Sequence, residues 1–143
     1  MHLIVYTSEL TAPSENINIL LKCIVEHAAV KNAQSDITGL LFYHNSRFLQ
    51  FIEGHQAALD TLMQTMSKDP RHKNIVRIID ETVPERSFSD WAMDSFNLNN
   101  NDVISLEELN AVRDVYRKYA NVIPGALANF YKHMLASQKN TNS

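Results

Sequence analysis

The chain is short of glycine, cysteine and long apolar runs, and each shortage excludes a class of protein. With 3 glycines in 143 residues, a phosphate-cradling loop of the Walker or dinucleotide-binding type is not expected, because such loops need several glycines close together. No stretch approaches the roughly 18 apolar residues that suggest a membrane span, and the first residues lack the pattern of a secretory signal. We therefore expect a cytoplasmic protein that makes no membrane contact.

The single cysteine, Cys23, cannot form an intramolecular disulfide and fits a reducing compartment. It lies near the apolar stripe of an expected helix, so we expect a buried thiol and not a nucleophile. Six histidines are present, but no two of them are four residues apart as in a helical metal motif. We therefore expect no metal site.

The charge of the chain and its missing motifs narrow the function further. A formal net charge of -3, with basic residues scattered along the chain, is not typical of a nucleic-acid-binding surface. The nucleophile-elbow motif of serine hydrolases is also missing. We therefore expect no nucleic-acid partner and no enzymatic turnover.

Strand and helix patterns alternate along the chain in an order typical of one architecture. Runs of β-branched and aromatic residues mark strands, and apolar residues three and four apart mark amphipathic helices. The order predicts an α+β fold: a ferredoxin-like βαββαβ core with a fifth strand, plus two C-terminal helices. The expected strands cover residues 3–6, 37–43, 47–53, 74–81 and 88–96, and the apolar stripes of the first two helices run over residues 17–28 and 59–66.

A polar break near residue 97 divides the chain into two expected parts. Residues 1–97 form the core domain, and residues 98–143 form a helical extension whose polar end, from residue 139, is expected to fray. Ser105 and Glu108 match a capping box that opens the first helix of the extension. Because the helices of the core would cover one face of the sheet, we expect the extension to cover the other face or to form a dimer contact.

Two polar side chains occupy strand positions that the two-residue repeat predicts to be buried. Gln50 shares a strand face with Phe48 and Ile52, where an unpaired amide would cost on the order of 1–3 kcal/mol. Tyr6 raises the same question in the first strand, because a buried phenol hydroxyl needs a partner. Antiparallel pairing of the first and third strands would bring the two together. On spacing alone, mutual hydrogen bonding in an ordinary core is the favoured explanation.

Other candidate residues also have ordinary structural explanations when they are taken singly. Asn32, at the expected end of the first helix, is typical of a C-terminal cap. Residues 69–72 are typical of a turn with solvated charges, and Trp91 and Met93 of core or rim packing.

Taken in order, however, these pieces resemble the BLUF family of blue-light sensors that use FAD. The resemblance covers about residues 1–97 and is specific as an ordered set. It rests on Tyr6 in a Leu-Ile-Val-Tyr-Thr-Ser strand, on Asn32 followed by Asp-Ile-Thr-Gly-Leu-Leu, on Arg-Phe-Leu-Gln-Phe-Ile-Glu-Gly at residues 47–54, on Asp-Pro-Arg-His at 69–72 and on Glu-Arg-Ser-Phe-Ser-Asp-Trp-Ala-Met at 85–93.

The resemblance implies that a flavin ring is held non-covalently between the two helices of the core. FAD is the family expectation, although FMN stays open because such sites engage mainly the ring. The resemblance implies that Asn32 bonds the polar edge of the ring and that Gln50 lies between the ring and Tyr6. Apolar residues expected on the two helices, such as Ile24 and Leu41, would sandwich the ring.

The resemblance also implies contacts of Arg71 and His72 with the ribityl or phosphate portion of the flavin, and at most an accessory role for Lys31. In this family, light drives electron and proton transfer through the tyrosine and the glutamine, here Tyr6 and Gln50. The hydrogen bonds around the flavin are then rearranged.

The signal would leave the site through the last strand, where Trp91 and Met93 compete for inward positions, and through helices over residues 105–137. The implied output is a partner protein or a change of homo-oligomeric state. Three other functions are compatible with the sequence. They are an acylphosphatase-like hydrolase of the same fold, a light-independent small-molecule sensor, and an oligomerisation domain without flavin. Of these, the glycine shortage disfavours the hydrolase, since it would need a phosphate-binding loop.

Overall fold

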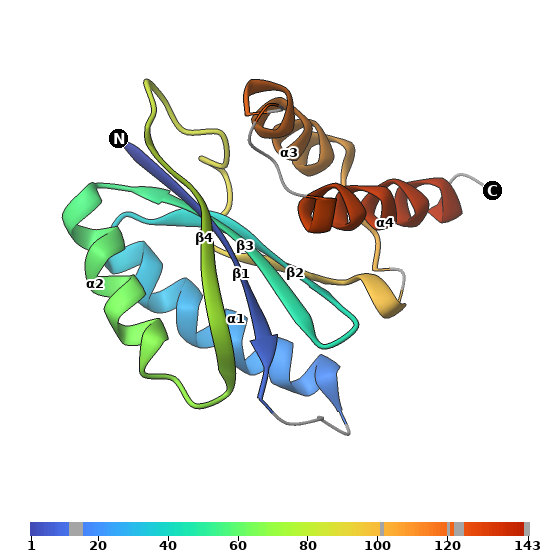
Figure 1. Ribbon diagram of the computed structural model, residues 1–143, viewed down its shortest axis with the longest axis horizontal. Helices are drawn as coiled ribbons and strands as arrows, with labels where there is room; N and C mark the ends of the chain where they lie inside the picture. Colours follow the sequence, from blue (N-terminus) through green and yellow to red (C-terminus); the bar gives the residue numbers. More distant parts are fainter. Residues whose placement is uncertain (12–15, 101, 120, 122–124, 142–143) are drawn as a thin grey trace.

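Five strands form one mixed sheet in the order β4-β1-β3-β2-β5 (Figure 1). The computed structural model describes residues 1–11, 16–100, 102–119, 121 and 125–141. The elements are β1 (His2–Leu10), α1 (Ile17–Gln34), β2 (Thr38–His44), β3 (Arg47–Gly54), α2 (Gln56–Ser67), β4 (His72–Thr82), β5 (Asp94–Asn97), a 3-10 turn η1 (Leu98–Asn100), α3 (Leu106–Lys118) and α4 (Gly125–Thr141). The predicted α+β, ferredoxin-like order with a fifth strand and two further helices is confirmed.

Helices cover both faces of the sheet, α1 and α2 on one side and α3 and α4 on the other (Figure 1). Successive strand residues point to opposite faces, so the central strands supply two separate hydrophobic clusters. Val5 packs in a cluster with Leu109 of α3 and Leu127 of α4. Tyr6, the next residue, packs in the other cluster with α1 and with Leu59 of α2. The extension therefore covers the face that the core helices leave open.

The β2–β3 hairpin fixes the register of the central strands. Asn45 and Ser46 join the strands with φ values of 48° and 65°, the left-handed pair that a tight two-residue hairpin turn requires. Antiparallel pairing of β1 with β3, as predicted, then places Tyr6 directly opposite Gln50. Both side chains point to the α1 and α2 face, because directly opposed residues share a face.

The fifth strand is shorter than predicted. The expected strand over residues 88–96 was wrong in its first two thirds: β5 begins at Asp94, and Trp91 and Met93 lie in the loop before it. Phe88 is fully buried in this loop, and the carbonyl oxygen of Trp91 accepts a hydrogen bond from Gly39 N–H at 2.8 Å. Tertiary contacts therefore replace the ladder that the aromatic composition suggested.

Two smaller expectations also differ from the structure. Cys23 is exposed on α1, so the expected buried thiol was wrong. The helix α4 is described to Thr141, and residues 142 and 143 of the tail that was expected to fray lie outside the described residues. Across the described part of the chain, none of the helices has the length and apolar character needed to cross a bilayer.

The predicted capping box opens α3 and includes a buried carboxyl group. The Ser105 hydroxyl accepts from Glu108 N–H at 3.1 Å and donates to Glu108 Oε1 at 2.7 Å. The Glu108 side chain is buried under the helix. Burial, together with the neighbouring Asp94 carboxyl of β5, raises the pKa of Glu108 to about 7.

This raised pKa predicts a pH-dependent stability. An ordinary glutamate titrates near 4.5, so the contribution of Glu108 to stability is present in full below about pH 4.5 and is lost as the pH rises through about 7. Glu108→Gln stays neutral at every pH. We expect the free energy of unfolding of this variant, relative to the parent, to rise between pH 5 and pH 8 in urea unfolding. Glu107→Gln, which changes an exposed carboxyl of the same turn, is the control. A constant difference between Glu108→Gln and the parent would contradict the assignment.

Candidate functional site

A cavity of about 330 Å³ lies between α1 and α2, above the central strands. Its volume is within the range of small-molecule binding sites. The floor comes from Tyr6, Leu41 and Gln50, and apolar walls come from Ile24 and Ala28 of α1 and Leu62 and Met66 of α2. The family resemblance grouped Leu41 with the helix residues around the ring, but it lies on β2, within the strand expected over residues 37–43, and contributes to the floor.

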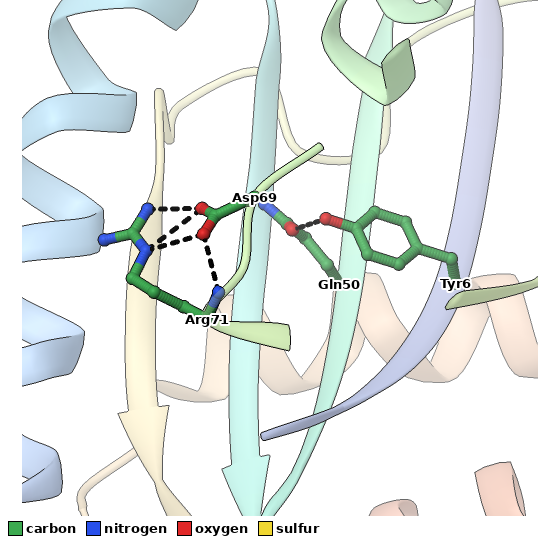
Figure 2. Close-up of polar contacts among 4 residues, drawn as sticks. All are labelled: Tyr6, Gln50, Asp69 and Arg71. Carbon is green, nitrogen blue, oxygen red and sulfur yellow. Dashed lines mark hydrogen bonds and ion pairs between the residues drawn. The ribbon is translucent and has the colours of Figure 1, made fainter. Parts of the chain in front are cut away.

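Tyr6 and Gln50 are joined by a buried hydrogen bond at the floor of the cavity. The Tyr6 hydroxyl donates to Gln50 Oε1, and Figure 2 shows the polar ends of the two side chains pointing toward one another from neighbouring strands. The tyrosine is 1% exposed and the glutamine 6%. Burial, and after it the carboxylate of Asp69, raises the pKa of Tyr6 far above its usual range, so the phenol stays protonated.

The other end of the Gln50 amide points to the loop before β5. Gln50 Nε2 lies 3.7 Å from the Met93 sulfur, which is a weak acceptor. Met93 is buried, 4% exposed, in the same cluster as Tyr6. The glutamine therefore connects the tyrosine on one side with the methionine on the other.

Asn32 lies in the last turn of α1 and is 1% exposed. The helix continues past it to Gln34 and is capped at Ser35, so its expected role as a C-terminal cap was wrong. Its Nδ2 donates to the carbonyl oxygen of Ala92 at 3.0 Å. Because Asn32 also lines the cavity, its amide lies between the pocket and the loop that carries Met93.

Charged side chains gather at the turn between α2 and β4. Arg71 holds Asp69 through three hydrogen bonds between its guanidinium and the carboxylate, from 2.6 to 3.0 Å, and a fourth from its backbone N–H at 2.9 Å (Figure 2). The guanidinium keeps the pKa of Asp69 below its usual range. Both residues line the cavity, together with Lys31 and Lys68. The site thus has an apolar interior and a positively charged side.

His72 also lines the cavity and has unmet hydrogen-bonding capacity. Among the described residues, neither of its buried ring nitrogens has a hydrogen-bond partner. Burial lowers the pKa of the imidazole, which leaves a neutral ring with one donor and one acceptor. Buried polar atoms without partners are uncommon, so this ring is suited to a polar group of a bound molecule.

The structure brings six of the eight predicted site residues to this one cavity. These are Tyr6, Ile24, Asn32, Gln50, Arg71 and His72. Met93 reaches it through Gln50. Trp91 does not reach it: the ring packs against Phe88, 6.5 Å between centroids, in the cluster on the α3 and α4 face. The sequence analysis missed the ion pair between Asp69 and Arg71. The two residues flank Pro70 in the chain, and this spacing was the feature that could have indicated it.

Comparison with known proteins identifies the family. The family model described as sensors of blue-light using FAD, BLUF, matches residues 1–94. The chain belongs to this family. The antirepressor BluF of Escherichia coli, described as blue light- and temperature-regulated, is 36% identical over 75 residues, or 52% of this chain and 19% of that protein. The beta subunit of photoactivated adenylate cyclase from Euglena longa is 34% identical over 91 residues, 63% of this chain and 10% of the relative.

The similarity extends to solved structures. The dark-state structure of BlrB, a BLUF protein, matches with a TM-score of 0.67 and 27% identity, covering 95% of this chain and 96% of that one. The agreement therefore includes the helical extension, beyond the residues matched by the family model. The chain spans a fifth or less of the two curated relatives, so their full activities do not transfer with the domain.

The residues around the cavity fit the flavin that BLUF domains bind. Apolar walls from α1 and α2 suit the two faces of a planar ring. The amides of Asn32 and Gln50 suit its polar edge, because an amide offers both donor and acceptor atoms. The ring nitrogens of His72, which have no hydrogen-bond partner among the described residues, suit a further polar group.

These contacts predict that Asn32→Ala weakens flavin binding. The variant loses an amide that lines the cavity and leaves the Ala92 carbonyl without its partner. A hydrogen bond contributes about 0.5–1.5 kcal/mol net, so we expect the dissociation constant for flavin to rise roughly threefold to tenfold. Titration of apoprotein with flavin measures it. Asn110→Ala, on α3 at the opposite face of the sheet, is the control and should bind flavin as the parent does. If Asn32→Ala bound flavin with the affinity of the parent, Asn32 would not contribute to flavin binding.

Proposed function

We propose that this chain senses blue light by rearranging the hydrogen bond between Tyr6 and Gln50 beside a bound flavin. The observation that carries the proposal is the position of this pair: a protonated phenol donates to a glutamine amide at the floor of the cavity. The family supplies the general function, a blue-light sensor using FAD. The roles of individual residues that follow are our proposal for this chain.

We propose FAD as the bound flavin. The family description supports it, and the cationic groups of Lys31, Lys68 and Arg71 beside the cavity suit a phosphate-bearing side chain. When bound, the flavin absorbs blue light and then accepts an electron. Chromatography of the flavin released by denaturation identifies it, and release of FMN alone would overturn this assignment.

The protonated state of Tyr6 determines what the residue can donate. Burial makes loss of the phenol proton alone unfavourable, so the proton leaves together with an electron. Gln50 Oε1, which already accepts the Tyr6 hydrogen bond, receives that proton. The proton and the electron return to Tyr6 afterwards. The Gln50 amide is left rearranged, by rotation or tautomerisation. Glutamine suits this task because its amide carries an acceptor at one end and donors at the other.

The output is proposed to pass through the loop before β5 to α3 and α4. Met93 touches Gln50, and Trp91 packs in the cluster that includes residues of α3 and α4. A change at Gln50 thus has a packed route to the far face of the sheet. We propose that this face contacts a partner protein or a second copy of the chain, and that the chain itself performs no chemical turnover.

The alternative functions lose support at the site. A light-independent sensor or an acylphosphatase-like hydrolase would not require a buried Tyr6–Gln50 pair at the floor of a cavity. The match to a family of light sensors favours the photoreceptor over both.

The absorption spectrum tests the proposal directly. We expect the purified parent protein to show a flavin spectrum that shifts to the red after blue light and returns in darkness. Tyr6→Phe should bind flavin at the parent ratio but show no stable red shift, since it lacks the donor to Gln50. Tyr43→Phe is the control, because it removes another buried phenol on the same face. The Tyr43 hydroxyl accepts from Ser46 N–H, so this variant should keep the red shift. A full photocycle in Tyr6→Phe would rule out the proposed relay.

Gln50→Leu tests the other half of the pair. Leucine has no polar atom, so the Tyr6 hydroxyl loses its acceptor and the flavin loses an amide neighbour. We expect this variant to retain flavin, to absorb at a position that matches neither the dark nor the light form of the parent, and to show no shift on illumination. A light-induced shift of the parent size would show that the rearranged group is not Gln50.

A further inference from the structure

The loop before β5 is held to the central strands by one buried carboxylate. Glu53 lies on β3, three residues after Gln50, and is 1% exposed. Its Oε1 accepts from Phe88 N–H at 2.5 Å and its Oε2 from Ser87 N–H at 2.8 Å. The Thr38 hydroxyl donates to Oε1 at 3.2 Å. Burial raises the pKa of Glu53, and the bonds from the two amides oppose that rise. Two backbone N–H groups and one hydroxyl therefore hold the loop and the start of β2 to this one carboxyl group.

Arg86 holds the same loop from the opposite direction. Its guanidinium reaches back over the start of β2 and donates to Thr38 Oγ1 at 2.9 Å, to the Glu53 carbonyl oxygen at 3.3 Å and to the Asp36 carbonyl oxygen at 2.6 Å. It also pairs with the Asp36 carboxylate at 3.0 Å. The arginine side chain is 14% exposed. We call Glu53, Arg86 and Thr38 the loop anchor.

From the anchor the chain runs to both candidate signalling residues. Phe88, whose N–H bonds Glu53, is fully buried and packs against Trp91. The Phe88 carbonyl oxygen accepts from Trp91 N–H at 3.1 Å. Two residues further, Met93 places its sulfur at the Gln50 amide. Met93 thus lies at the end of a segment whose beginning, at Ser87 and Phe88, is held by Glu53.

We propose that Glu53 is a positioning residue for the photoreaction: through the Ser87 and Phe88 amides it holds Met93 against Gln50 and thereby stabilises the dark orientation of that amide. The inference rests on the proposed function, because the photoreaction is its context. Among the described residues, the hydrogen-bond partners of Glu53 do not line the cavity, so the proposed effect is indirect and passes through Met93.

Glu53→Gln tests the anchor with a minimal change of volume. A glutamine replaces one acceptor oxygen with an NH₂ group, which cannot accept from a backbone N–H, so at least one of the two amide bonds is lost. Glu85→Gln is the matched control: it removes the same charge from an exposed side chain one residue before Arg86. Both variants are compared as flavin-loaded full-length chains.

Two readouts follow. The lit state of Glu53→Gln should return to the dark form at least threefold more slowly than the parent, because the dark orientation of Gln50 loses support from Met93. Trp91 is the single tryptophan of the chain, so its fluorescence reports on the loop alone. Quenching of that fluorescence by acrylamide in the dark should increase in Glu53→Gln. Glu85→Gln should match the parent in both measurements.

A double-mutant cycle separates positioning from a general structural effect. In a Met93→Ala background, Glu53→Gln should no longer alter the recovery rate, since no side chain is left for the anchor to position. Recovery at the parent rate in Glu53→Gln, or the same slowing with and without Met93, would overturn the proposal.

A measurement on the unmodified protein covers the case in which Glu53→Gln does not fold. Amide hydrogen exchange in the dark should show Ser87 and Phe88 protected to the degree of β3 amides. Exchange of both at the rate of exposed loop amides would overturn the anchor. This readout does not depend on light: a parent without a red shift would reject the proposed function, whereas protected amides would still establish the anchor.

Discussion

The register of β1 against β3 is the constraint on which the site depends. Because side chains alternate with a period of two, a slip by one residue would move Tyr6 or Gln50 to the opposite face of the sheet. The hairpin at Asn45 and Ser46 sets β2 against β3, and the antiparallel ladder of β1 with β3 places Tyr6 opposite Gln50. The hydrogen bond between Tyr6 and Gln50 is therefore a consequence of how the whole sheet is paired.

The sheet can hold polar side chains at its centre because it has two hydrophobic clusters. The cluster under α3 and α4 receives apolar side chains from all three central strands, and the buried Glu53 shares this face near the end of β3. The cluster under α1 and α2 contains Tyr6, borders Gln50 and Asn32, and leaves the cavity between the helices. The two faces therefore differ in one respect: the face under α1 and α2 leaves a cavity for a ligand above the sheet, beside its apolar cluster.

The sequence predicted those parts of the site that depend on local periodicity. Strand alternation placed Tyr6 and Gln50 on buried positions, and antiparallel pairing of two strands brought them together without further information. The parts that failed depend on contacts between distant residues. Asn32 was expected to cap its helix, but its amide donates to Ala92, 60 positions later. No pattern within the helix indicates such a partner.

The loop before β5 failed for the same reason. Phe88, Trp91 and Met93 have the composition of a strand, and local preference alone extends β5 back to residue 88. The Glu53 carboxylate, 35 positions earlier than Phe88, takes the backbone N–H groups that a strand would give to its neighbour. Burial raises the pKa of Glu53, and the bonds from the Ser87 and Phe88 amides oppose that rise. These two bonds stand here where a ladder was expected.

This loop is also the place where the two clusters meet. Phe88 and Trp91 belong to the cluster under α3 and α4, while Met93 belongs to the cluster under α1 and α2. The segment crosses from one face to the other within five residues, next to β2 at the parallel edge of the sheet. A close-packed interior resists gradual deformation, and one residue separates Trp91 from Met93, so we propose that a movement of Met93 is passed on to Trp91. On this proposal, a rearrangement of the Gln50 amide at the cavity floor is coupled by packing to the face that carries α3 and α4.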